Sequence, residues 1–114
     1  SLVGNGAASV HGKAHPNYLK MVLDWQAKAD VHVQGDIGHV PGTIVHGFHG
    51  WKPDRNYVGR WSILTDNAYD PETDVVKDSQ GMLRLTAAKP ALRDGLRRYF
   101  RQRFEDAGRK SWPV

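Results

Sequence analysis

The chain has 114 residues and a formal net charge of +4; 16 residues are Lys or Arg, 12 are Asp or Glu, and none is Cys. This length is typical of a single domain with a modest core, and the lack of cysteine excludes a disulfide scaffold, a thiolate zinc site and a cysteine nucleophile. No apolar run approaches the roughly 18–20 residues of a membrane span. We expect one cytoplasmic domain over 1–114, irregular over 1–15, structured over 16–106 and with a tail over 107–114.

A first helix is predicted from Pro16 to about Gln34. Proline suits the first helical position because its missing N–H would have no partner there. Apolar residues then recur at offsets of three and four, which places them on one helix face: Tyr18, Met21, Val22, Trp25 and Ala29. Gly35 is typical of the residue that ends a helix.

The middle of the chain predicts a strand followed by a helix. The β-branched residues 43–45 favour a short strand near 37–48, with a turn or bulge at Pro41 and Gly42. A second helix is predicted from Pro53, because apolar residues repeat there at i, i+4 and i+7: Tyr57, Trp61 and Leu64. We expect the large aromatic side chains of both helices to lie in the core.

The last third predicts a turn, a strand and a third helix. Residues 67–78 are rich in turn-forming residues, and the acids of the 70–74 segment favour an Asx turn with a capped helix start over a cation site. A short strand is predicted near 82–85. The third helix is predicted from about Pro90, with an apolar stripe at Leu92, Leu96, Tyr99, Phe100 and Phe104. The fold class is therefore α/β, or α+β for an isolated piece, with about three helices.

Positive charge is concentrated at the end of the chain. Residues 89–114 hold eight Lys or Arg and three acidic residues. Arg93, Arg97 and Arg101 recur every four residues and would line one helix face. This pattern is typical of a solvated helix face, and it also fits a small basic module that binds nucleic acid or protein through the 89–110 helix. We expect no specific nucleic-acid binding, because few aromatic residues interleave with the arginines.

Two histidines lie three residues apart beside glycines. His46 and His49 would face opposite sides of a regular strand, but Gly47 lets the chain turn between them. From spacing alone they are either a structural pair or two of the imidazole ligands of a divalent ion.

Linked blocks over most of the chain carry a more specific signal. They are IGHVPGTI (37–44), HGFHG (46–50), KPDRNYVGRWSIL (52–64), YDPETD (69–74), KPALRD (89–94) and YFRQRFED (99–106). In these blocks the chain resembles the C-terminal region of a family of bacterial and phage-encoded glycosyltransferase-like proteins. The resemblance extends from about Leu2 to Asp106.

The resemblance implies a GT-A fold, a nucleotide-sugar donor, an unknown acceptor and a divalent cation, Mn²⁺ or Mg²⁺. Such enzymes carry an Asp-x-Asp motif, which these 114 residues lack and which the family pattern places upstream. We therefore expect the C-terminal part of a longer glycosyltransferase, which is inactive by itself and can form a homo-oligomer.

Residue by residue, the resemblance assigns a metal site and a substrate-binding site. His46 and His49 match the first and last histidines of the family's His-His-Trp-His-Gly stretch, in which this chain has Gly47 and Phe48 instead. Lys52 and Arg55 match the block that follows and are implied to contact the diphosphate. No residue of the chain is assigned as the catalytic base.

Overall fold

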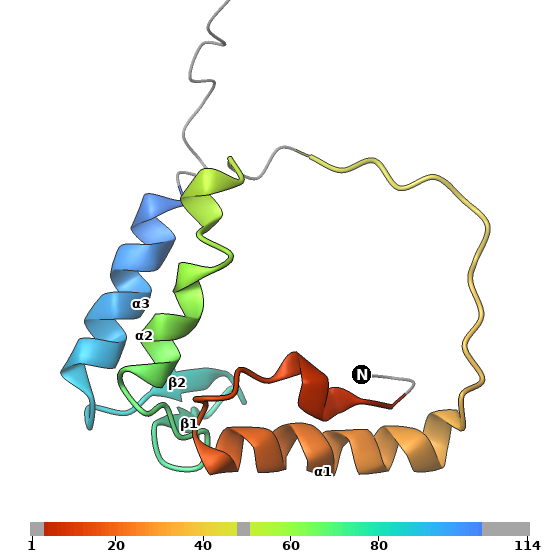
Figure 1. Cartoon of the computed structure of the whole chain (residues 1–114), viewed down its shortest axis with the longest axis horizontal. Helices are drawn as coiled ribbons and strands as arrows, with labels where there is room; N and C mark the ends of the chain where they lie inside the picture. Colours follow the sequence, from red (N-terminus) through yellow and green to blue (C-terminus); the bar gives the residue numbers. More distant parts are fainter. Residues whose placement is uncertain (1–3, 48–50, 104–114) are drawn as a thin grey trace, which may run out of the picture.

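The computed structural model describes residues 4–47 and 51–103, and within them the chain is a mixed α+β structure. It consists of three helices and a two-stranded antiparallel sheet. The elements are α1 (Pro16–Val33), α2 (Ser62–Thr65), β1 (Val75–Lys77), β2 (Leu83–Leu85) and α3 (Pro90–Gln102), with 3-10 turns η1 (Gly6–Ser9), η2 (Pro53–Arg55) and η3 (Gly59–Trp61). Helices α2 and α3 and the sheet gather at the N-terminal end of α1 (Figure 1). None of the helices in this described part is long and apolar enough to span a bilayer.

Helix α1 begins and ends where the sequence predicts. His15 caps its first turn by accepting a hydrogen bond from the N–H of Asn17, and the helix ends at Gln34 and Gly35, which adopt positive φ angles of 51° and 74°. The predicted core stripe is only partly correct, because Trp25 is 48% exposed and Ala29 is the one buried residue of α1.

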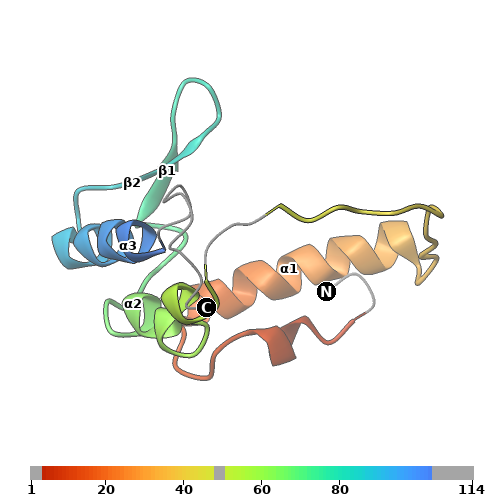
Figure 2. The ribbon, with the colours of Figure 1, turned by 90° about the horizontal axis from the view of Figure 1, so that it is seen from above.

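The N-terminal segment covers part of α1. Figure 2 shows this segment running alongside the helix, and the N–H of Gly6 donates a hydrogen bond to the side-chain oxygen of Gln26. A Cβ on Gly6 would lie 3.1 Å from Val22, so glycine permits this close approach. The predicted irregular region over 1–15 therefore contains an ordered turn, η1, that packs on the helix.

The strand predicted near 37–48 is wrong over the described residues 37–47, which are extended but not paired in a sheet. A strand forms by hydrogen bonding to a neighbour, and the only sheet in the described part is β1–β2. Residue 48 lies outside the described residues.

The helix predicted from Pro53 is broken into η2, η3 and α2. The break occurs at Asn56, which adopts a left-handed conformation (φ 41°) and accepts a hydrogen bond from the N–H of Gly59 at 3.0 Å. An asparagine that satisfies the backbone locally competes with continuation of the helix. Trp61 is half-buried and packs at 5.9 Å between ring centroids against Tyr18, whereas Tyr57 is 48% exposed and is not a core residue.

The predicted strand near 82–85 is confirmed as β2, and its partner β1 lies in the segment predicted as a turn. The register pairs Val75 with Leu85 and Lys77 with Leu83. Asp70 does form the predicted Asx turn, accepting the N–H of Glu72 at 2.9 Å, but β1 follows it instead of a helix.

Helix α3 begins at Pro90 as predicted and buries Leu92 almost completely, at 1% exposed. Gly95 faces Ile63, where an added Cβ would lie 3.1 Å from that side chain, so α3 packs close to α2. Phe100 is 59% exposed and is not part of the core, and Phe104 lies outside the described residues.

A buried carboxylate links the turn, the hairpin and α3. Asp74 is 2% exposed, and its Oδ2 accepts hydrogen bonds from the N–H of Asp70 at 2.8 Å and from Nζ of Lys89 at 2.7 Å. The Lys89 ammonium also donates to the carbonyl of Ala68 at 2.7 Å. Burial disfavours the charged form of Asp74 and is the largest single influence, but these donors together outweigh it and lower the pKa of the carboxyl.

We predict that Asp74→Asn destabilises the protein by about 2 kcal/mol or more, because it leaves the Lys89 ammonium without its charged partner. The measurement is urea unfolding followed by circular dichroism. The matched control is Asp24→Asn, which removes the exposed ion pair with Lys20 and is expected to cost about 0.5 kcal/mol or less. Equal effects of the two substitutions would contradict the structural role of Asp74.

We also predict that the folded protein loses stability in acid. The pKa values of Asp70, Asp74 and Asp78 are all lowered in the folded chain, so each contributes stability above its ordinary pKa of 3.8. That contribution is lost as the pH falls through the folded-state values. Thermal unfolding between pH 7 and pH 2 should show the melting temperature falling below about pH 4, with a shallower fall in Asp74→Asn. An unchanged pH profile in that variant would contradict this assignment.

Candidate functional site

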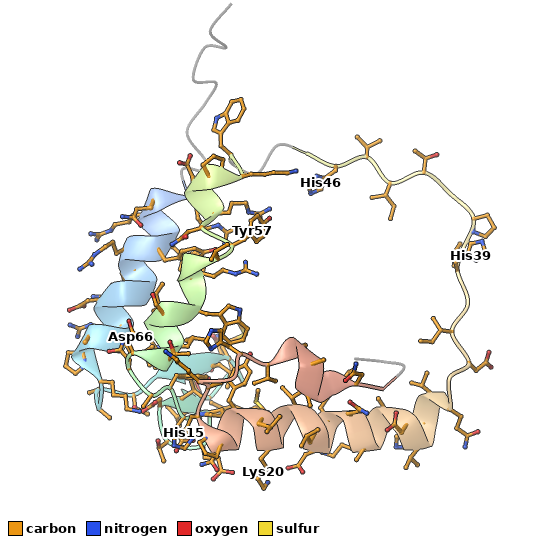
Figure 3. The ribbon with its side chains drawn as sticks, in the orientation of Figure 1. His15, Lys20, His39, His46, Tyr57 and Asp66 are labelled. Atoms are coloured by element: carbon orange, nitrogen blue, oxygen red, sulfur yellow. The ribbon has the colours of Figure 1, made fainter. Side chains whose placement is uncertain are left out.

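The residues assigned from the sequence lie along one segment and the turn that follows it. We call residues 36–47 the arm. His46 lies on the arm at the end nearer η2, and Figure 3 shows His39 farther along the same segment. Lys52 precedes η2 and Arg55 is its last residue. His49 lies outside the described residues, so its placement beside His46 stays a prediction.

The arm is a long segment outside any helix or strand, and its apolar side chains are exposed to solvent. Val40, Ile44 and Val45 are 92%, 94% and 89% exposed. Between Gly38 and Val45 the backbone makes no hydrogen bond with any other described residue. Figure 1 shows the arm leaving the end of α1 and running well away from the helices. Residues 38–45 of the arm thus present both a β-branched surface and backbone polar groups that make no hydrogen bond with other described residues.

The turn after the arm is held by α3. The hydroxyl of Tyr99 donates a hydrogen bond to the carbonyl of Arg55 at 3.1 Å. The Arg55 guanidinium in turn donates to the hydroxyl of Tyr57 at 2.8 Å, and the guanidinium of Arg60 lies 4.9 Å from the centre of the Tyr57 ring. Lys52 is exposed, so η2 offers an ammonium and a positioned guanidinium three residues apart. Ammonium and guanidinium groups in this arrangement suit phosphate oxygens.

A metal ion needs more ligands than the described residues bring together. Over residues 4–47 and 51–103, no three His, Asp or Glu side chains gather in a group that could hold an ion. Of the two assigned histidines only His46 is described, and His39, the other imidazole of the arm, lies farther along the segment, whereas Mn²⁺ and Mg²⁺ prefer several oxygen ligands. The described residues therefore do not fit a complete metal site, and the assignment of His46 and His49 stays a prediction.

A second feature lies on α3, where the charge pattern predicts a basic face. Arg93, Arg97 and Arg101 border a surface groove of about 700 Å³ that continues onto β2. Arg84 and Phe100 also line this groove, although the sequence does not predict either of them at a basic surface. Arg84 joins the groove through the hairpin register, which only the fold supplies, and Phe100 was assigned to the core because it falls on the helical stripe.

No protein-family model, curated protein or solved structure matches the chain. The glycosyltransferase resemblance therefore rests on the sequence blocks alone, and the GT-A fold that it implies stays a prediction. The chemical groups that the arm and η2 provide are the ammonium of Lys52, the guanidinium of Arg55 and the imidazole of His46. No described side chain is placed as a base or a nucleophile by this arrangement.

We predict that limited digestion of the purified chain by thermolysin, which cleaves before bulky apolar residues, cuts first within the arm, before Val40, Ile44 or Val45. Exposed backbone without hydrogen bonds enters a protease site without local unfolding. Mass spectrometry of the early fragments identifies the cut. Leu19 and Leu23 in α1 are the internal controls, because they require the helix to open. A first cut at these leucines would contradict the exposed state of the arm.

Proposed function

We propose that this chain is part of a metal-dependent glycosyltransferase that transfers a sugar from a nucleotide-sugar donor to an acceptor. The arm and η2 contribute to the donor site, and the rest of that site comes from residues outside this chain. The observation that carries the proposal is that the blocks IGHVPGTI and HGFHG, two of those in which the chain resembles the family, begin on the most exposed apolar segment of the described structure.

The backbone and β-branched side chains of residues 43–45 favour pairing with the edge strand of a sheet in a partner. Residues 43–45 are β-branched and already extended, and their backbone donors and acceptors are unpaired among the described residues. An extended segment of this kind is satisfied by adding to a sheet, which buries alternate side chains and completes the hydrogen bonds. A GT-A sheet contributed by the upstream part of a longer protein is such a partner. The arm would then hold His46 at the edge of that sheet.

The charges after the arm support a diphosphate as the ligand. Lys52 and Arg55 lie on one short turn that follows the arm, and the hydrogen bond from Tyr99 fixes the backbone of Arg55. A divalent cation, when bound, would neutralise charge on the nucleoside diphosphate, with His46 as one ligand. The nucleotide-sugar donor is a cytoplasmic metabolite, so we place the protein in the cytoplasm.

We predict that Lys52→Ala and His46→Ala in the full-length protein each weaken Mn²⁺-dependent binding of a nucleoside diphosphate by about tenfold or more. The ligands UDP and GDP are each titrated by calorimetry, with and without Mn²⁺. His39→Ala is the matched control, because that histidine lies on the same arm outside the assigned site. Melting temperatures should stay close to wild type in all three variants.

Two outcomes contradict the proposal. One is wild-type nucleotide binding by both Lys52→Ala and His46→Ala, which would remove the arm and η2 from the donor site. The other is turnover of a UDP-sugar or GDP-sugar by the 114-residue chain alone, which would mean that no upstream residues are needed.

A further inference from the structure

The groove between β2 and α3 combines an apolar surface with a row of arginines. Leu96 and Phe100 lie one helical turn apart on α3 and meet Leu85 of β2, and together they form the apolar part of the groove. Arg93, Arg97 and Arg101 form a parallel row along the same helix. Phe100 is more than half exposed, so a ring is available to a bound molecule. This surface lies on elements separate from the arm.

The arginines of the groove differ in how far their charge is compensated. Arg84 forms an ion pair with Asp78 at 2.7 Å, and Arg93 forms one with Asp94 at 2.9 Å. Neither Arg97 nor Arg101 makes an ion pair or hydrogen bond with another described residue.

Beside the groove, Arg97, Arg98 and Arg101 also surround Asp94 in a depression of about 290 Å³. The pKa of Asp94 is lowered, first by its hydrogen bond from Arg93 and further by the charges of Arg97 and Arg98. The single carboxylate of Asp94 thus faces several guanidinium groups, and the surface attracts a further anion.

We propose that the groove binds an acidic amphipathic helix of a partner protein. Its carboxylates pair with Arg97 and Arg101, and its apolar side chains rest on Leu96 and Phe100. Four residues of an α-helix rise about 6 Å, so acidic residues spaced four apart on the partner match the spacing of the arginines on α3. Guanidinium groups pair with carboxylates through two parallel hydrogen bonds, and an amphipathic helix laid in an apolar groove is a common mode of recognition.

The composition of the groove favours a peptide over the other anionic partners. Single-stranded nucleic acid binds through successive aromatic platforms, and Phe100 is the one aromatic residue that lines this groove. A membrane surface is met by the apolar face of one amphipathic helix, whereas the apolar residues here come from both α3 and β2. The partner proposed here does not depend on the glycosyltransferase proposal.

The test uses the whole chain and a fluorescein-labelled peptide of four Glu-Ala-Ala-Leu repeats, with binding followed by fluorescence anisotropy. We expect saturable binding that weakens with added salt. Arg97→Glu combined with Arg101→Glu should weaken it by about tenfold or more, and Phe100→Ala, which retains both charges, by about fivefold to tenfold. The matched control is Lys13→Glu combined with Lys28→Glu, which changes the net charge equally at exposed sites outside the groove and should leave affinity within about twofold.

Further probes separate the proposal from its alternatives. A peptide of Glu-Ala-Ala-Ala repeats lacks the leucines, and a peptide of Lys-Ala-Ala-Leu repeats lacks the glutamates. Each should bind at least about tenfold more weakly than the Glu-Ala-Ala-Leu peptide. Equal binding of the Glu-Ala-Ala-Ala peptide, or an equal loss in the lysine control, would overturn the groove as a specific site. Tighter binding of a single-stranded oligonucleotide, or of vesicles that contain phosphatidylserine, would overturn the assignment of a peptide partner.

Discussion

The carboxylate of Asp74 is the point on which the arrangement of the other elements depends. Its side chain joins the ammonium of Lys89 at the start of α3, and its backbone carbonyl accepts the N–H of Thr86 at 2.8 Å, where the hairpin ends. The same lysine reaches the carbonyl of Ala68 in the preceding turn. A buried charge pair of this kind specifies geometry more than it adds stability. Here it fixes where β2 leaves the hairpin and where α3 begins, and so it sets the position of the groove between them.

Apolar side chains in this chain are divided between a small core and exposed surfaces. Leu92 is nearly inaccessible, and the rings of Tyr18, Trp61 and Tyr69 pack against one another with centroids about 6 Å apart. In contrast, the arm leaves its β-branched residues in contact with solvent. The hydrophobic effect acts on any such surface, and this contrast between core and arm is the physical basis for our proposal that residues outside the chain cover the arm.

Sequence reasoning succeeded where the determining interactions are local and failed where they are distant. The ends of α1 follow from Pro16 and Gly35, and α3 begins at Pro90, because backbone limits of single residues decide these positions. The strand predicted over the arm failed since β-branched residues indicate a strand only when a partner edge is present. Phe100 fits the helical stripe by its spacing, yet its side chain is more than half exposed in the fold, whereas Leu92 is buried. For the candidate site, the sequence predicts that Arg93, Arg97 and Arg101 share one helix face. It does not predict that this face lies beside β2, because that depends on the register of the hairpin.

The hydrogen bond from the Tyr99 hydroxyl to the Arg55 carbonyl joins α3 to η2. Tyr99 is the neighbour of Phe100, and the two rings pack edge to face with centroids 5.4 Å apart. A molecule that displaces the Phe100 ring would therefore alter how firmly α3 holds the backbone of η2. Coupling between two binding events is reciprocal in free energy. An anion bound at η2 and a helix seated on α3 would thus change each other's affinity by the same factor, which makes this one phenol a thermodynamic link between the two surfaces.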